Sequence, residues 1–351
     1  MKAVPVRSRA DFRDFLDLPV RLHPRDRYVP LPAPVIAAQR RTAELFIVRD
    51  ITGRVVGRTS VHRDAAFDTK AGPRQLFGHT EFVDDPAVFA ALMDVAGKDT
   101  LFGPVALLPN QTGGVITSGF ADRGFVDSAW NPSYYPAMYE RHGFTRRFEA
   151  DTWIVDVSGS AAAYPFDDTR LAAEDLVIRH GSRRRLREQL PVLRGMLNAS
   201  FAQLGYYTEI SAAQLAEQTD GLSFLLDEGL LVWLEKAGRP ISFVVAVPDI
   251  SEFLMTVGGR LGVLEQLRLL ATRSRYRRDA VLVIKGTVPD EQGRGYLRLL
   301  SREVHRHLEA GGYRSLRSTF VERDNAASAA HYRRAGGRPL HGYTFYERAA
   351  R

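Results

Sequence analysis

The stretch Val281-Leu-Val-Ile-Lys-Gly-Thr-Val-Pro-Asp-Glu-Gln-Gly-Arg-Gly-Tyr296 decides the fold of this chain. Residues 281–288 form a short apolar run rich in β-branched side chains, which predicts a buried strand. Pro289 ends that strand because proline has no N–H to donate to a β-ladder. After the turn, apolar side chains recur at helical spacing, at Leu297, Leu300, Val304 and Leu308. The stretch therefore predicts a strand, a turn and a helix in direct succession.

The turn between strand and helix, residues 292–295, contains two glycines. Glycine allows a backbone to turn tightly and to pass close to a ligand. The first N–H groups of the following helix and the positive end of its dipole attract an anion, and Arg294 adds a positive charge. A glycine turn is also common as a plain connection between a strand and a helix. The turn therefore predicts a diphosphate site only in combination with further evidence.

That evidence lies further along the chain. Residues 313–321 are typical of another strand, and residues 325–337 are typical of a short helix. Asn325 is suited to cap the start of this helix, and Gly336 is suited to end it. With both parts in place, residues 281–346 resemble the GNAT superfamily of acyl-CoA-dependent N-acyltransferases.

Two signatures carry the resemblance. The first is Gln/Arg-x-x-Gly-x-Gly/Ala after a strand, which stands here as residues 292–297. Its last position departs from the family, because Leu297 is larger than the usual glycine or alanine. The second is an asparagine, a tyrosine seven residues later and a glycine four residues beyond, matched by Asn325, Tyr332 and Gly336. Together the two signatures are fairly specific for the superfamily.

The resemblance implies acetyl-CoA or another acyl-CoA as co-substrate, and no metal. A backbone N–H within residues 284–288 would stabilise the oxyanion of the thioester. Gly286 marks either a bulge that opens the ladder for pantetheine or a plain kink in a core strand. The positions that the resemblance assigns to the coenzyme are Ile284, Gly286, Val288, Gln292, Gly293, Arg294, Gly295, Tyr296 and Asn325.

The resemblance makes Tyr332 the acid that protonates the departing thiolate; the alternative is a tyrosine that packs on the sheet. The general base stays open. Glu322, the first candidate, and Asp324 lie at the end of the strand before the short helix, whereas Asp249 and Glu252 follow a hairpin and are weaker candidates for substrate contact. The remaining titratable helix residues are expected to be exposed: His305, His307 and His331.

The chain has 351 residues, which favours two domains, at 1–160 and 175–351. Both halves show the same order of predicted helices, hairpin, strand, helix and strand. Asn131, Tyr139 and Gly143 repeat the second signature with one extra residue before the tyrosine. The fold class expected is α/β: two tandem GNAT-like domains, each a mixed, mostly antiparallel twisted sheet flanked by helices.

The N-terminal half is expected to be degenerate. Its strand at 76–83 is followed by Asp84, Asp85 and Pro86 instead of a glycine loop. Carboxylates at a helix N-terminus already satisfy the positive dipole and repel an anionic ligand. Only the C-terminal half is then expected to bind the coenzyme, an arrangement that mycothiol synthase also shows.

The net charge and the amino-acid composition limit the classes of partner that this chain can have. The formal net charge is +7, with basic runs at 183–187 and 273–278, which suits an anionic coenzyme and leaves tRNA open. There are no cysteines, so disulfides, thiolate nucleophiles and zinc–thiolate sites are excluded. Residues 1–7 lack the apolar core of a signal peptide, and no stretch approaches ~18 consecutive apolar residues. The sequence therefore predicts a cytoplasmic protein without a membrane partner.

Three functions are compatible with these observations. The first is transfer of an acyl group, expected to be acetyl, from acyl-CoA to the amine of a small molecule. The second is an aminoacyl-tRNA-dependent transferase, which the basic runs favour and the glycine loop disfavours. The third is a protein that binds the coenzyme without turnover.

Overall fold

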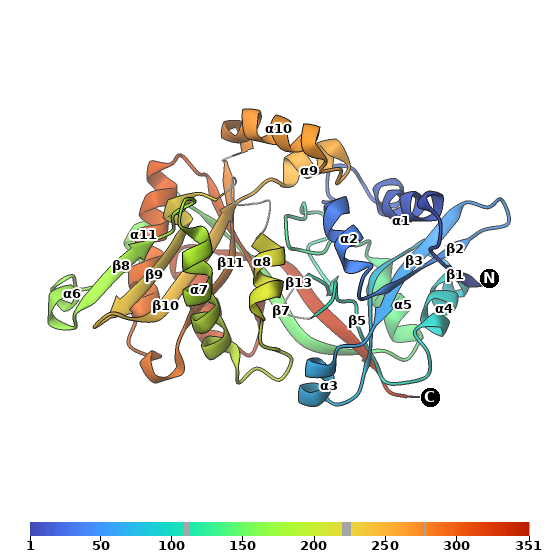
Figure 1. The fold of residues 1–351 in the computed structure, drawn as a ribbon, viewed down its shortest axis with the longest axis horizontal. Coiled ribbons are helices and arrows are strands. Elements are labelled where there is room, and N and C mark those ends of the chain that lie inside the picture. Colours follow the sequence, from blue (N-terminus) through green and yellow to red (C-terminus); the bar gives the residue numbers. More distant parts are fainter. Residues whose placement is uncertain (109–111, 220–225, 277, 351) are drawn as a thin grey trace. The chain divides into compact units, whose positions relative to one another are not determined.

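The computed structural model describes residues 1–108, 112–219, 226–276 and 278–350 (Figure 1). The chain divides into two compact units, each made of more than one segment. Unit 1 consists of Met1–Asp151, Ser251–Leu267 and Leu340–Arg351, and unit 2 consists of Thr152–Ile250 and Arg268–Pro339. Spatial units and sequence repeats need not share their limits, so the domain boundaries near residues 160 and 175 stay a prediction.

Unit 2 contains the stretch 281–296 and is built on a mixed sheet. Its strands, in spatial order from one edge, are β8 (Leu176–His180), β9 (Leu231–Lys236), β10 (Arg239–Pro248), β11 (Asp279–Thr287), β12 (Ser315–Glu322) and the end of β7 (Thr145–Asp156). Neighbours from β8 to β11 pair antiparallel, and β11 pairs with β12 in parallel. The strand predicted at 281–288 is therefore confirmed as a central strand.

Helices flank this sheet. They are α6 (Thr169–Ala173), α7 (Leu186–Phe201), α8 (Ala212–Thr219), α11 (Tyr296–Ala310), α12 (Ala326–Arg334) and the last part of α10 (Val263–Thr272). The predicted amphipathic helix is α11, which buries Leu300, Val304 and Leu308 against the sheet core, while Leu297 is only partly buried. Burying one such side chain stabilises the fold by roughly 1.5–3 kcal/mol. Helix α11 is thus fixed on β11 mainly by its apolar stripe.

Unit 1 is also built on β-strands of mixed direction. In spatial order its strands are β1 (Ala3–Pro5), β2 (Glu44–Arg49), β3 (Val55–His62), β4 (Gln75–Phe82), β5 (Leu101–Gly103) and β13 (Arg338–Arg348), with β6 (Val115–Ile116) also paired to β13. Its helices are α1 (Arg9–Leu22), α2 (Ala33–Gln39), α3 (Ala65–Ala71), α4 (Pro86–Val95), α5 (Tyr134–Arg141) and α9 (Ser251–Val257). Aromatic side chains dominate its core, among them Phe77, Phe82, Phe89 and Tyr139.

The two units repeat one pattern of strand pairing. In unit 1, β1 to β4 are successive antiparallel neighbours and β4 pairs in parallel with β5. In unit 2, β8 to β11 are successive antiparallel neighbours and β11 pairs in parallel with β12. One helix connects each parallel pair, α4 in unit 1 and α11 in unit 2. This agreement confirms the predicted fold class of two mixed, mostly antiparallel sheets in tandem.

The helix α4 starts in the way its acidic residues predict. The carboxylate of Asp85 accepts a hydrogen bond of 2.8 Å from the N–H of Ala87, and Pro86 occupies the first helical position. This N-terminus is therefore already occupied by a carboxylate of its own chain.

Unit 1 also buries a polar cluster around Glu81 at the end of β4. Its carboxylate lies 2.6 Å from His23 Nε2 and 3.9 Å from Arg58, and it accepts a hydrogen bond of 2.9 Å from the Tyr135 hydroxyl. The nearby positive charges and hydrogen bonds hold the pKa of Glu81 below its usual value despite burial.

Within the described ranges, no helix is both long and apolar enough to cross a bilayer.

Candidate functional site

In unit 2 the two parallel strands separate after a short stretch of pairing. The register of β11 and β12 runs from Asp279 opposite Ser315 to Leu282 opposite Ser318, although β11 continues to Thr287. Beyond this fork, the Thr319 hydroxyl still donates to the Val283 carbonyl at 2.8 Å. The other edge of β11 remains paired with β10 up to its last residue.

Among the described residues, the fork leaves one edge of β11 without a ladder partner at residues 284–287. Backbone N–H and C=O groups on an open strand edge can pair with an extended ligand. These residues include Ile284 and Gly286, which the sequence assigned to the coenzyme, and Val288 follows directly. A thioester carbonyl held at this edge would meet a fixed backbone N–H.

Gly286 is needed for packing and not for a bulge. The irregularity in the β10–β11 register lies between Val245 and Ala246, whose partners are Ile284 and Leu282, so the predicted bulge at Gly286 is displaced from that position. A Cβ at Gly286 would lie 2.9 Å from side-chain atoms of Phe243 and Ser200. The absence of a side chain there lets α7 approach the sheet.

The loop after β11 is held in shape by its own side chains. The Gln292 amide donates a hydrogen bond of 3.0 Å to the carbonyl of Thr287, the last residue of β11. Glu291 is buried and lies 3.2 Å from Lys236 and 3.1 Å from Arg294. The positive charge of Arg294 is therefore already paired with a carboxylate, and Gln292 folds the loop back on the strand.

Gly293 and Gly295 adopt the left-handed conformation, with φ of +79° and +82°. A Cβ added at either position would meet nothing within 4 Å, so both glycines border open space. Gly295 also precedes α11 as its N-cap, and no side chain caps this helix end. The first N–H groups of α11 therefore face that space without an acceptor from a capping side chain. The sequence predicts an anion site at this helix start.

The side chain of Tyr296 does not contribute to that site. It is buried, and its hydroxyl donates a hydrogen bond of 2.5 Å to Glu174. Its backbone N–H, at the first position of α11, is the group that remains available. Leu297 packs against the sheet core, so the departure from the family signature is accommodated inside unit 2.

The short helix predicted at 325–337 is α12. The Asn325 side chain accepts a hydrogen bond of 3.0 Å from the N–H of Ser328, and Gly336 follows the helix with φ of +74°. Asn325 thus acts as the predicted cap, and its oxygen is engaged in that role. Between these residues α12 presents Tyr332 to the sheet.

Tyr332 is buried at the fork. Its ring stacks on Trp153 with centroids 5.8 Å apart, and its hydroxyl is hydrogen-bonded to Ser318, the last paired residue of β12. Burial raises the pKa of Tyr332 above its usual value. The Lys285 Nζ lies 4.1 Å from the centroid of the same ring. The structure thus brings Tyr332 to β11, where the sequence placed the thioester.

The candidate carboxylates are dispersed. Glu322 accepts a hydrogen bond from the Tyr206 hydroxyl. Asp249 is buried and forms an ion pair of 3.3 Å with Arg317. Asp324 is exposed at the turn before α12, and Glu252 is exposed in the first turn of α9, in unit 1. Within the described residues, no group of three histidines and carboxylates could hold a metal ion.

The expectation of three exposed histidines was wrong. His307 is half-buried, and its Nε2 lies 2.8 Å from a carboxylate oxygen of Asp227. His305 is buried, and its Nδ1 lies 2.5 Å from the Ser160 hydroxyl. His331 is half-buried, and its Nε2 lies 2.9 Å from the Ser301 hydroxyl. Burial, followed by the charge of Lys285, lowers the pKa of His305 to about 4 and that of His331 to about 2. Both imidazoles are therefore neutral near pH 7.

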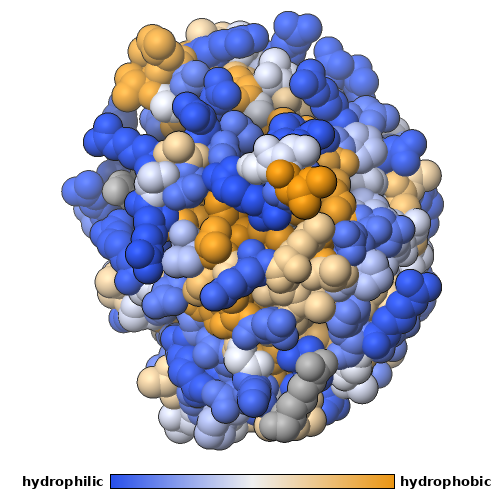
Figure 2. Space-filling model, turned by 90° about the vertical axis from the view of Figure 1, so that its right-hand side faces the viewer, coloured by the Kyte–Doolittle hydropathy of each residue, from blue (hydrophilic) through white to orange (hydrophobic). Residues whose placement is uncertain are grey.

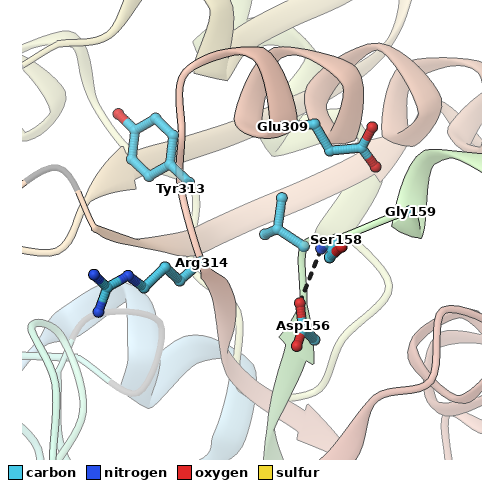
Figure 3. Close-up of a pocket in the computed structure, with 7 residues that line it drawn as sticks. Asp156, Ser158, Gly159, Glu309, Tyr313 and Arg314 are labelled. Atoms are coloured by element: carbon cyan, nitrogen blue, oxygen red, sulfur yellow. Dashed lines mark hydrogen bonds between the residues drawn. The ribbon is translucent and has the colours of Figure 1, made fainter.

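A separate hollow of about 550 Å³ lies at the opposite end of α11 (Figure 3). Its lining residues are Asp156, Val157, Ser158, Gly159, Glu309, Tyr313 and Arg314. Helix α11 has 15 residues, so the hollow is roughly 20 Å from the glycine loop. It faces the negative end of the helix dipole and is lined by two carboxylates, so it does not suit a diphosphate.

These features define a class of fold: the tandem arrangement of GCN5-related N-acetyltransferase (GNAT) units. No protein-family model matches the chain. A tandem GNAT protein from the clavulanic acid biosynthesis pathway aligns with 99% of this chain and 97% of its own, with a TM-score of 0.55 and 15% identity. The GCN5-related glucosamine N-acetyltransferase region of a fungal multi-domain GH3 β-N-acetylglucosaminidase has a TM-score of 0.62 and 16% identity over 98% of this chain, which spans 38% of that protein.

Two curated proteins are similar in sequence. Protein YghO of Escherichia coli (strain K12) is 24% identical over 275 residues, which cover 72% of this chain and 70% of that protein. The bacterial ceramide synthase of Caulobacter vibrioides (strain NA1000 / CB15N) is 23% identical over 379 residues, which cover 99% of this chain and 97% of that protein. The second similarity therefore extends over both units.

Proposed function

We propose that this protein is an N-acyltransferase that moves an acyl group from acyl-CoA to an amine. The observation that carries the proposal is the fork of β11 and β12, which leads directly into the uncapped glycine loop before α11. A forked strand edge and an anion site in succession match a ligand with an amide-bearing arm and a diphosphate. Coenzyme A has both.

In this proposal each part of the site has one task. The N–H groups of Gly293, Gly295 and the first turn of α11 hold the diphosphate. The open edge of β11 at 284–287 pairs with the pantetheine amides and supplies the N–H that stabilises the oxyanion. Tyr332 donates a proton to the departing thiolate. Glu322 is the first candidate for the base, because it lies at the end of the strand before α12.

The proposed acceptor is a long-chain amine. Ceramide, named in the Caulobacter relative, is an amide between a fatty acid and a long-chain amino alcohol, and that relative matches the chain over its whole length. A tRNA donor receives less support from the basic run at 183–187. The Arg183 guanidinium donates a hydrogen bond to the Leu226 carbonyl, and its backbone N–H donates one to the Glu228 carboxylate. Arg185 forms an ion pair with Glu188.

The test is release of free coenzyme A thiol in the presence of an amine. Because the chain has no cysteine, a thiol reagent such as Ellman's reagent detects only the product. Palmitoyl-CoA with sphinganine is compared with acetyl-CoA and short-chain amines, and mass spectrometry identifies the amide. Amine-dependent thiol release supports the proposal. Coenzyme binding without release from any pair would indicate a binding protein, and acyl transfer only from charged tRNA would indicate the aminoacyl-tRNA alternative.

A further inference from the structure

The exposed face of α10 (Val263–Thr272) is apolar. Four of its side chains are strongly exposed: Val263 at 74%, Leu264 at 78%, Leu267 at 58% and Leu270 at 42%. Successive residues of a helix are rotated by about 100°, so these four form one stripe. Leu269 lies on the opposite side and is fully buried.

This pattern is unusual for a helix on a protein surface. Such a helix normally turns its apolar face inward and its polar face to water. Single exposed hydrophobic residues are common, but a contiguous group marks a contact surface. Four of the nine large hydrophobic residues that are exposed in the described part of the chain belong to α10. Figure 2 shows a group of hydrophobic residues at the upper left edge of the face that it draws.

Positive charge surrounds the stripe. The exposed arginines in and around the helix are Arg260, Arg268, Arg273, Arg275 and Arg278. Within the described residues none of the five takes part in an ion pair. Glu265 is the only acidic residue between positions 260 and 276. Arg277, the remaining arginine of the basic run, lies outside the described residues.

We propose that α10 docks the protein on an anionic phospholipid surface. The stripe of Val263, Leu264, Leu267 and Leu270 would enter the boundary between headgroups and acyl chains, and the flanking arginines would meet lipid phosphates. A second copy of this chain is a poorer occupant, since pairing two such helices brings their arginines together. Docking of this kind does not depend on acyl transfer, because it uses only the exposed face of α10 and its flanking arginines.

The test is co-sedimentation with vesicles of phosphatidylcholine, with and without phosphatidylglycerol. We expect binding to the anionic vesicles that weakens with salt. The double variant Leu264→Ser/Leu267→Ser should lower the partition coefficient by roughly tenfold or more. The matched control is Ile51→Ser, which removes a fully exposed apolar side chain elsewhere and should leave binding unchanged.

A second set of variants tests the contribution of the arginines. Arg268→Gln/Arg273→Gln should weaken binding several-fold and flatten its salt dependence, whereas the exposed pair Arg184→Gln/Arg187→Gln should not. All these positions are exposed, so the variants are expected to fold. Equal vesicle binding by wild type and the double leucine variant would overturn the proposal. So would a concentration-dependent dimer that the leucine substitutions dissolve, since a second copy would then cover the stripe.

An independent observation concerns Lys285. Its Nζ is buried and, within the described part of the chain, has no hydrogen-bond partner. A buried lysine normally has a carboxylate beside it. The titratable groups that face Lys285 are Tyr332 and His331 on α12 and His305 on α11, and none of them is a carboxylate. The ammonium therefore rests against the ring of Tyr332, 4.1 Å from its centroid.

We infer that Lys285 is a positioning residue that makes Tyr332 a usable acid. The inference rests on the proposed function. When the C–S bond of the tetrahedral intermediate breaks, sulfur keeps the electron pair and the Tyr332 hydroxyl gives it a proton. The resulting tyrosinate faces the Lys285 ammonium, and it later takes up the proton that the acceptor ammonium released.

A comparison of pKa values shows why Tyr332 needs Lys285 beside it. A phenol has a reference pKa near 10 and a thiol one near 8.5, so the transfer is already unfavourable in water. Burial raises the pKa of Tyr332 further. A positive charge within contact distance lowers the pKa of an acid by about one to three units, which offsets part of this disadvantage. Burial in turn lowers the pKa of Lys285 to about 7, so this assistance fades above neutral pH.

The test compares Lys285→Met with Lys285→Arg, which keeps the charge at every pH. In the thiol-release assay, kcat of wild type should fall above about pH 7, Lys285→Met should lose at least roughly tenfold, and Lys285→Arg should retain activity without the alkaline fall. In a Tyr332→Phe background, Lys285→Met should cost nothing more. Additive effects, or a wild-type pH profile in Lys285→Met, would overturn the inference.

A second readout does not depend on turnover. Carbon-13 NMR of labelled tyrosine, assigned with Tyr332→Phe, should show that Tyr332 ionises at least about one pH unit lower in Lys285→Arg than in Lys285→Met. Equal titration would overturn the inference about Lys285. Absence of acyl transfer by wild type would instead count against the proposed function, so the two failures are distinguishable.

Discussion

Replacing Gly295 or Gly293 by alanine separates two consequences of the glycine loop. Both residues have positive φ, and an added Cβ meets no atom within 4 Å. The only cost to folding is then the left-handed backbone, about 1–2 kcal/mol for a residue with a side chain. Each variant should therefore fold, with a melting temperature lower by a few degrees at most.

Coenzyme binding should suffer more. The methyl group would stand in the open space beside the N–H groups of the loop, where the diphosphate belongs in our proposal. Losing one charge-assisted hydrogen bond costs about 1.5–3 kcal/mol. This corresponds to a Kd for coenzyme A that is roughly 10- to 100-fold higher.

Gly312 provides the matched control. It follows the C-terminal end of α11, its φ is +71°, and a Cβ there also meets nothing within 4 Å. Gly312→Ala should thus lose as much stability as the loop variants and keep full coenzyme affinity. The measurements are isothermal titration with coenzyme A and thermal unfolding. Equal Kd values for Gly295→Ala and Gly312→Ala would show that the loop is a plain connection and would refute the coenzyme site.

Three further predictions follow from the same structure. Tyr332→Phe should lower kcat by roughly 10²–10⁴-fold with coenzyme affinity intact; reduced stability at unchanged kcat would make Tyr332 a packing residue. Calorimetric titration should give one coenzyme per chain, and a second site would contradict the occupied start of α4. Glu81→Gln leaves the buried Arg58 without its carboxylate and should cost about 3–5 kcal/mol in denaturant unfolding. Because the pKa of Glu81 is lowered, this contribution is complete above the ordinary value of 4.5 and is lost as pH falls through the lowered pKa; identical acid unfolding of both proteins would contradict it.

Local chemistry made the strand, the loop and both helices of the candidate site predictable. Pro289 must end a strand, and positive φ at Gly293 and Gly295 requires glycine or its rare substitutes. The Asn325 side chain can satisfy the free N–H groups of a helix start, and it does so in α12. Each of these effects acts within a few residues, so the sequence contains all the information needed.

The side-chain tasks were harder to predict because they depend on tertiary neighbours. Gln292 was assigned to the coenzyme, yet its amide bonds the Thr287 carbonyl. A signal for His305 did exist, because positions 301, 304, 305 and 308 have the spacing of a buried helix stripe. The sequence also contained a signal that Lys285 is buried, since a lysine inside a strand that is apolar on both faces cannot reach water easily.

The fork itself has no local signature, since it depends on where two strands distant in sequence stop pairing. Its position nevertheless explains the site. Ser318 closes the parallel ladder opposite Leu282 and bonds the Tyr332 hydroxyl, which places the candidate acid at the apex of the fork. Lys285 comes three residues after Leu282 and contacts the same ring. The divergence that leaves the backbone of β11 open to the proposed thioester therefore also sets the candidate acid and its positive neighbour beside it. In our proposal, a substitution that extends the β11–β12 ladder should remove coenzyme binding and proton donation together.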